Sequence, residues 1–81
     1  MMWIEITNAK YLDDYKLFLV FNDGQKRIFD FLPLIERYPV FKPLVDKSLF
    51  KSFEITDTLE WADGNIDIAP EYIYENGIVA Q

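Results

Sequence analysis

The sequence predicts one small α+β domain, in which an antiparallel sheet packs against short helices. Two observations support this prediction. Residues 2–31 show strand-like alternation with a tight turn, whereas prolines divide residues 31–51 into pieces too short for a long helix. Of the 81 residues, 51% are apolar and 17% are aromatic, which suffices for one hydrophobic core but leaves no room for a second.

Three strands are expected in the N-terminal part, joined as an antiparallel meander. Residues 2–7 alternate apolar and polar side chains, and residues 16–21 are apolar on both faces, as in a central strand covered on each side. Asp23-Gly24 follows, and this pair is a strong hairpin signal because glycine adopts positive φ without strain. The third strand is expected over residues 26–31. One of its faces consists of Arg27, Phe29 and Phe31.

Short helical turns are expected in the middle of the chain. Pro33, Pro39 and Pro43 forbid one long helix, because proline lacks an amide hydrogen and clashes with the preceding turn. Single turns are therefore predicted over residues 34–38 and 44–46. A further turn is predicted from Ser48, as its cap, to Lys51.

Two short strands and a C-terminal helix complete the predicted domain, which spans residues 1–81. The strands are expected over residues 52–56 and 58–61, followed by a turn and by alternating residues 65–69. The helix is expected to begin near Pro70, with Glu71 in the favourable position against the positive end of the helix dipole. Gly77 is predicted to end it.

Charge is divided unevenly along the chain, whose formal net charge is −6. All eight Lys and Arg residues lie at or before Lys51. Seven acidic residues and no basic one follow; they are Glu54, Asp57, Glu60, Asp63, Asp67, Glu71 and Glu75. Because a field of one sign attracts basic partners and repels phosphates, we expect a basic partner and no nucleic acid.

Residue types exclude several kinds of site. The chain has no cysteine, hence no disulfide or thiolate metal site, and no histidine, the commonest general base. The spacing of Asp63, Asn65 and Asp67 matches the opening of a calcium loop. However, Ile68 stands where such a loop needs glycine, and Tyr74 stands where it usually has Glu. We therefore predict no metal, no cofactor and no catalytic residue.

A cytoplasmic protein without a membrane partner is expected. The longest apolar run, residues 17–21, is far too short to cross a bilayer. The N-terminal residues also lack the basic and apolar regions of a signal peptide.

Three blocks of residues occur in a distinctive order. From Trp61 to Tyr74 the chain has Trp, Asp-Gly, Asp-Ile, Ala-Pro-Glu and Tyr-Ile-Tyr. The other blocks are Leu19-x-Phe21-x-Asp23-Gly24, with Asp30-Phe31 closing the next strand, and Phe41-x-x-Leu44-x-Asp46 followed by Phe50. Together they cover nearly the whole chain. In order and spacing they resemble a small bacterial family, domain-of-unknown-function family 2442.

This resemblance implies a small α+β fold and supplies no catalytic residues. Members are often described as encoded beside a second small protein, which has led to a toxin–antitoxin proposal. Some relatives carry an added helix-turn-helix, which we do not expect after Gly77, so direct DNA binding is not expected either. Ala69 stands where Ser or Asp is more usual before Pro70, which predicts a weak cap for the last helix.

The expected function is that of a non-catalytic, antitoxin-like interaction module that binds a small basic protein through an acidic C-terminal surface. The expected contacts are Glu60, Trp61, Asp63, Asp67, Glu71, Tyr72, Tyr74 and Glu75. Carboxylates would guide association, and the tyrosines, on opposite sides of the helix, would add apolar area. Trp61 is either an exposed anchor or, as the small size of the domain favours, a core residue.

Two alternatives remain open. One is a small-molecule-binding or enzymatic domain with a pocket holding two inward carboxylates. The other is a self-associating subunit of a larger complex, which would pair through a strand edge. The chain is accordingly expected to be a monomer or a homodimer.

Overall fold

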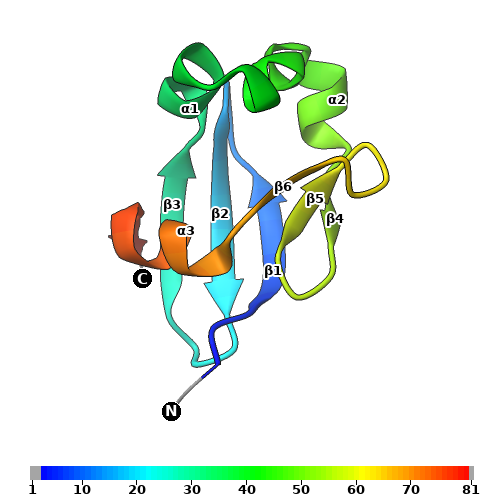
Figure 1. Ribbon diagram of the computed structural model, residues 1–81. Helices are drawn as coiled ribbons and strands as arrows, with labels where there is room; N and C mark the ends of the chain where they lie inside the picture. Colours follow the sequence, from blue (N-terminus) through cyan, green and yellow to red (C-terminus); the bar gives the residue numbers. More distant parts are fainter. Residues whose placement is uncertain (1–2, 81) are drawn as a thin grey trace.

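The computed structural model describes residues 3–80 and confirms the α+β class. Two antiparallel sheets are joined by short helical segments, which gather at one end of the larger sheet, while the last helix crosses its face (Figure 1). In chain order the elements are β1 (Ile6–Tyr11), β2 (Lys16–Phe21), β3 (Lys26–Asp30), α1 (Leu32–Arg37), the 3₁₀ segment η1 (Pro39–Val45), α2 (Lys47–Lys51), β4 (Glu54–Ile55), β5 (Leu59–Trp61), β6 (Ile66–Ile68), α3 (Pro70–Asn76) and β7 (Ile78–Ala80).

The larger sheet has the strand order β1-β2-β3-β7, and its first three strands form the predicted meander. The Asp23-Gly24 turn joins β2 to β3, and Gly24 has a φ of 85°, which glycine adopts without strain. Arg27 and Phe29 of β3 are buried on one face, as expected. The sequence pattern therefore located this hairpin correctly.

β2 is covered on one face only. Leu17, Leu19 and Phe21 are buried, whereas Phe18 and Val20 between them are half-buried. The expectation of a strand covered on both sides is wrong. The core shared with the helices and the second sheet lies on the face that carries Leu17, Leu19 and Phe21. The other face remains an outer surface of the molecule.

β1 begins later than the strand predicted over residues 2–7. Asn22 binds Glu5, just before β1: the backbone nitrogen of Asn22 donates to Glu5 O at 2.9 Å, and the side-chain Oδ1 of Asn22 accepts from Glu5 N at 3.0 Å. The ladder then continues as far as Tyr11, which lies opposite Leu17. Met2 lies outside the described residues.

The second sheet has the order β4-β5-β6. The strands predicted over residues 52–56 and 58–61 are present in shortened form as β4 and β5, and the alternation of residues 65–69 becomes β6. This sheet meets the edge of β1, where Ile6 N donates to Asp57 O at 3.1 Å. The sequence analysis expected one antiparallel sheet, whereas the structure has two, of four and three strands.

β7 was not predicted. It follows Gly77 and pairs antiparallel with β3, with Ile78 opposite Ile28. Gly77 ends α3 as expected. Because it has no side chain, it also lets the chain pass close to α3 and β3 as it enters β7. A Cβ at this position would lie 2.8 Å from Ile73 O and 3.0 Å from the Cβ of Arg27, so only glycine lets the backbone pass here without displacement.

The helical segments differ from the prediction in their boundaries. Pro33 lies in the first turn of α1, as expected. The single turn predicted over residues 44–46 is part of the longer η1, which begins at Pro39. The cap of α2 is Asp46 rather than Ser48, because the Oδ1 of Asp46 accepts a hydrogen bond from Ser48 N at 2.9 Å. α3 has no side-chain cap at Ala69, as predicted.

Candidate interaction surface

Three carboxylates form a row across the outer face of the second sheet. The strand register places Glu54 opposite Glu60, and Glu60 opposite Asp67. Alternation along β5 and β6 turns Leu59, Trp61, Ile66 and Ile68 inward, where they are buried. Like charges directly opposite each other destabilise a sheet. We therefore expect this acidic row (Glu54, Glu60, Asp67) to lower the stability of the sheet that carries it.

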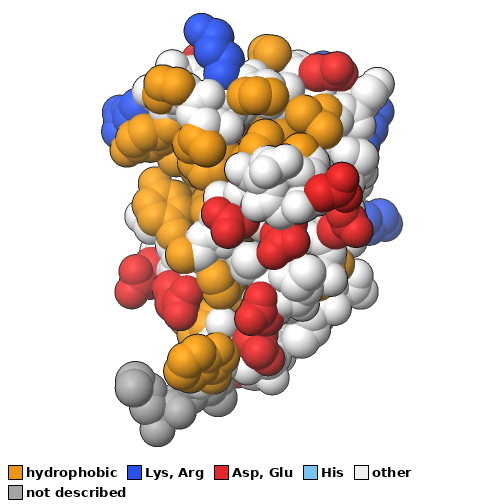
Figure 2. Space-filling model, turned by 45° about the vertical axis from the view of Figure 1, so that its right-hand side comes forward, with side chains coloured by type: hydrophobic (Ala, Val, Ile, Leu, Met, Phe, Trp, Pro, Cys, Tyr) orange, Lys and Arg blue, Asp and Glu red, His pale blue; other side chains and the backbone are white. Residues whose placement is uncertain are grey.

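The other C-terminal acids lie outside the acidic row. Asp57 and Asp63 occupy the turns at the two ends of β5, and Glu71 and Glu75 lie one helical turn apart on α3. Figure 2 shows several acidic side chains over the middle and lower parts of one face, with apolar side chains above, beside and below them and basic side chains at the margins.

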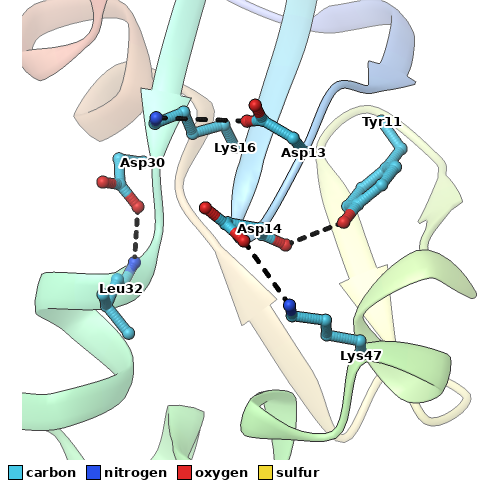
Figure 3. A network of polar contacts seen from close by, with 7 residues as sticks. All are labelled: Tyr11, Asp13, Asp14, Lys16, Asp30, Leu32 and Lys47. Carbon is cyan, nitrogen blue, oxygen red and sulfur yellow. Dashed lines mark hydrogen bonds and ion pairs between the residues drawn. The ribbon is translucent and has the colours of Figure 1, made fainter.

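Basic residues of the described chain form their ion pairs elsewhere. Lys47 Nζ lies 3.5 Å from Asp14 Oδ1, and Lys16 Nζ lies 4.0 Å from Asp13 Oδ1, both at the turn between β1 and β2 (Figure 3). The hydroxyl of Tyr11 donates to Asp14 O in the same network. Within residues 3–80, no acidic residue of the C-terminal third is neutralised by an ion pair.

Trp61 does not belong to this surface. Its side chain is 0% exposed and stacks on Phe50, with ring centroids 6.1 Å apart. Its Nε1 donates to Phe50 O at 2.9 Å, which satisfies the buried indole. Of the two alternatives for Trp61, the core position holds, and its place among the expected partner contacts is a correction to the sequence analysis.

Tyr72 and Tyr74 lie on opposite sides of α3, as expected, but only Tyr72 is available at the surface, with 42% of its area exposed. The hydroxyl of Tyr74 donates to Asp23 Oδ2 at 2.6 Å, and its ring packs edge-on against Phe21. The guanidinium of Arg27 lies 4.5 Å from the centroid of the Tyr74 ring. The hydrogen bond from Tyr74 lowers the pKa of Asp23, and the same bond raises the pKa of Tyr74. Tyr74 therefore makes its contacts within the chain, between α3 and the β2–β3 hairpin.

An apolar groove of about 340 Å³ lies beside the acidic row. One wall comes from α1 and η1, and the other from β6 and the start of α3. The groove is lined by Leu34, Tyr38, Val40, Phe41, Asp67, Ile68, Ala69 and Tyr72. Sequence analysis missed it because its walls come from segments far apart in the chain. Asp67 belongs both to the acidic row and to the wall of the groove.

A second hollow, of about 270 Å³, shares Leu34 and Tyr72 with the apolar groove and extends towards Ile78. Its single acidic lining residue is Asp30, just as Asp67 is in the groove. Neither of these hollows contains the pair of carboxylates that the pocket alternative requires.

Among residues 3–80, Asp, Glu, His and Cys side chains form no group of three or more that could hold a metal ion. Asp63 sits in a tight turn at a φ of 55°, next to Gly64. No helix between Trp3 and Ala80 has the length and apolar character needed to cross a membrane.

Comparison with known proteins identifies the family. A family model described as "Protein of unknown function (DUF2442)" matches residues 6–79. Comparison with curated proteins and with solved structures gave no significant match. The matched range runs from the start of β1 into β7 and includes both sheets, the acidic row and the groove. The family indicated by the three sequence blocks is confirmed: this chain belongs to the family of unknown function DUF2442.

Proposed function

We propose that this chain is a non-catalytic interaction module that binds a small basic protein through its acidic surface. The acidic row is the observation that supports the proposal best: three opposed carboxylates that form no ion pair with any residue between Trp3 and Ala80. The expected contacts are the acidic row with Asp63, Tyr72, Glu71 and Glu75. Glu54 is added to the contacts expected from the sequence, and Trp61 and Tyr74 leave them.

A basic partner would relieve the repulsion within the acidic row. Lys or Arg side chains placed over Glu60 would lie between two further carboxylates, and their attraction would replace an unfavourable cross-strand contact with a favourable one. The same field raises the rate of encounter with positively charged proteins. Both effects weaken as salt screens the charges.

The proposal is tested by capture from an extract of the native cells, using two matched variants. The row variant carries Glu54→Gln, Glu60→Gln and Asp67→Asn. The control variant carries Asp13→Asn, Asp14→Asn and Glu36→Gln, which remove the same charge from outside the acidic surface; Asn is tolerated at Asp14, whose φ is 46°. We expect the parent and the control to retain the same salt-eluted basic protein and the row variant to lose it. Equal retention by all three proteins would exclude the acidic row as the binding site.

An antitoxin-like role adds one more expectation. The captured protein should slow the growth of its host when it is produced without this chain, and co-production of the parent chain should restore growth. Co-production of the row variant should not restore it, because that variant no longer binds. Normal growth without this chain would reject the antitoxin-like role and leave the binding module in place.

Self-association is the second candidate, and the exposed edge of the larger sheet favours it. β7 pairs with β3 on one side and is the last strand in the sheet order. Its residues Ile78 and Val79 are 72% and 66% exposed. Unpaired strand edges are templates for pairing with another chain. Light scattering decides this directly, since a dimer has twice the 9.6 kDa mass of the chain.

A further inference from the structure

We propose that the apolar groove holds one apolar side chain of the basic partner, next to Lys or Arg residues of the same segment that lie over the acidic row. This inference rests on the proposed function and specifies the chemistry of the partner. The recognised element is an amphipathic basic segment: an aliphatic or aromatic side chain followed closely by positive charges.

Exposed apolar side chains converge on the groove from both walls. Tyr38 and Val40 are 43% and 55% exposed on one side, and Tyr72 is 42% exposed on the other. Single exposed apolar residues are ordinary, but a group lining one hollow marks a binding surface. The volume of about 340 Å³ is at the small end of ligand sites, so it suits an inserted side chain better than a large cofactor.

Asp67 sets the charge of the occupant. It is the carboxylate in the groove wall, and the acidic row continues from it through Glu60 to Glu54. Two strand spacings separate the ends of the row, about 10 Å, which is the length of about three extended residues. A segment that inserts an apolar side chain at Asp67 therefore places its next few residues over the row. Positive charges at those positions would meet all three carboxylates.

A second copy of this chain does not fit the groove as well. The chain has a net charge of −6, and Asp67 of the acidic row lines the groove, so two copies would bring like charges together. Neutral ligands would leave the charge of Asp67 without a counterpart beside their apolar group. Charge complementarity thus favours the amphipathic basic segment among the possible occupants.

The inference is tested with three short synthetic peptides, acetylated and amidated, titrated at low salt into the isotope-labelled chain and followed by NMR. The basic leucine peptide has one leucine followed by two lysines and one arginine. The basic serine peptide replaces that leucine with serine, and the neutral leucine peptide replaces the three basic residues with glutamine. We expect the basic leucine peptide to bind about tenfold more tightly than the basic serine peptide, because it buries one aliphatic side chain. Only the leucine peptides should shift the amide signals of Val40, Phe41, Ala69 and Tyr72.

Each other outcome rejects a defined part of the account. Equal binding of the two basic peptides, without shifts in the groove, would overturn the inference and leave the proposed function standing. Equal binding of the two leucine peptides would overturn the proposed function, since charge would then contribute nothing, and would restrict the groove to apolar recognition alone. No binding by any of the peptides would overturn both proposals.

Two valines of η1 provide a matched pair of variants. Val40 and Val45 are 55% and 57% exposed, but only Val40 lines the groove. We expect Val40→Ser to weaken the basic leucine peptide about fivefold and to leave the basic serine peptide unchanged. Val45→Ser should change neither affinity. Equal effects of the two substitutions on the basic leucine peptide would reject the groove as its site.

Discussion

Tyr74 joins the last helix to the hairpin of the larger sheet through both its hydroxyl and its ring. The hydroxyl donates to Asp23 in the β2–β3 turn, and Arg27 binds from the other side, with its Nε donating to Tyr74 O at 3.0 Å. Arg27 is 7% exposed, and its charge lies over the aromatic ring instead of against a carboxylate. At the scale of single residues, these contacts hold α3 beside the sheet and thereby position one wall of the groove.

Removal of the Tyr74 hydroxyl should give a stability loss that depends on pH. Its hydrogen bond lowers the pKa of Asp23 from the ordinary 3.8, so the bond stabilises the fold above that pH and is lost as the pH falls through the folded-state pKa. Tyr74→Phe should therefore unfold at a lower temperature than the parent at neutral pH, with a difference that shrinks below about pH 4. Thermal unfolding by circular dichroism measures both values.

Tyr72→Phe is the control for this prediction, since the Tyr72 hydroxyl has no hydrogen-bond partner among the described residues. Its unfolding temperature should follow that of the parent at every pH. A deficit of Tyr74→Phe that stays constant down to acidic pH would show that the hydrogen bond to Asp23 is not the cause.

The two tryptophans should report opposite environments. Trp61 is 0% exposed and Trp3 is 72% exposed. In Trp3→Phe, the remaining fluorescence should be blue-shifted and weakly quenched by acrylamide; in Trp61→Phe, it should be red-shifted and strongly quenched. Trp61→Phe should also lower the free energy of unfolding in urea by about 1–3 kcal/mol, because the buried carbonyl of Phe50 loses its donor. Strong quenching of Trp61 would contradict its place in the core.

At the scale of elements, the sequence predicted those parts of the fold that depend on local chemistry. The Asp23-Gly24 hairpin and the helix that begins at Pro70 follow from turn and capping preferences. β1 was misplaced because the bonds from Asn22 to Glu5 join distant segments and leave no local pattern. β7 was missed because three residues after a glycine carry no periodicity.

The candidate site was predictable to a similar extent. The seven C-terminal acids are plain in the sequence, but their arrangement as a row depends on the register of β4, β5 and β6, which composition does not reveal. The apolar groove needs residues of η1 opposite those of β6, and only the tertiary fold brings these together. Trp61 was offered as a contact because sequence cannot tell a strand residue that faces inward from its neighbour that faces outward.

The acidic row should oppose folding. Glu60 lies between two other carboxylates, so Glu60→Gln should raise the free energy of unfolding of the isolated chain by about 0.2–1 kcal/mol at low salt. The gain should diminish as salt is added, because screening already weakens the repulsion. Urea unfolding at two salt concentrations tests this. Glu36→Gln, in the exposed part of α1, is the control and should leave stability unchanged. A loss of stability in Glu60→Gln would contradict the repulsion.

Gly77 should be intolerant of a side chain although its φ is ordinary. The Cβ of Gly77→Ala would lie 2.8 Å from Ile73 O and 3.0 Å from Arg27 Cβ, so either α3 or β3 must move. We expect a loss of about 1–3 kcal/mol in unfolding free energy, the usual result of overpacking. Hydrogen exchange should show the loss concentrated in β7 and α3. An alanine variant with parental stability and exchange would show that this backbone crossing is not tight.

At the scale of the whole molecule, the ion pairs of the described residues lie apart from the acidic row. Ion pairs of the described residues lie around the β1–β2 turn, at Asp13 and Asp14, and the helices cover that end of the larger sheet. The acidic row lies on the outer face of the other sheet, beside the apolar groove. One face therefore combines unpaired negative charge with exposed apolar area, the composition expected of a surface that binds a basic, partly apolar segment.

The most direct test is the affinity of the protein captured from native cells, measured by calorimetry against salt concentration for the parent chain, the row variant and the control variant. The account predicts a steep decline in affinity with salt for the parent and for the control. It also predicts, for the row variant, a weaker affinity that depends much less on salt. The same affinity and the same salt dependence in all three proteins would contradict recognition through Glu54, Glu60 and Asp67.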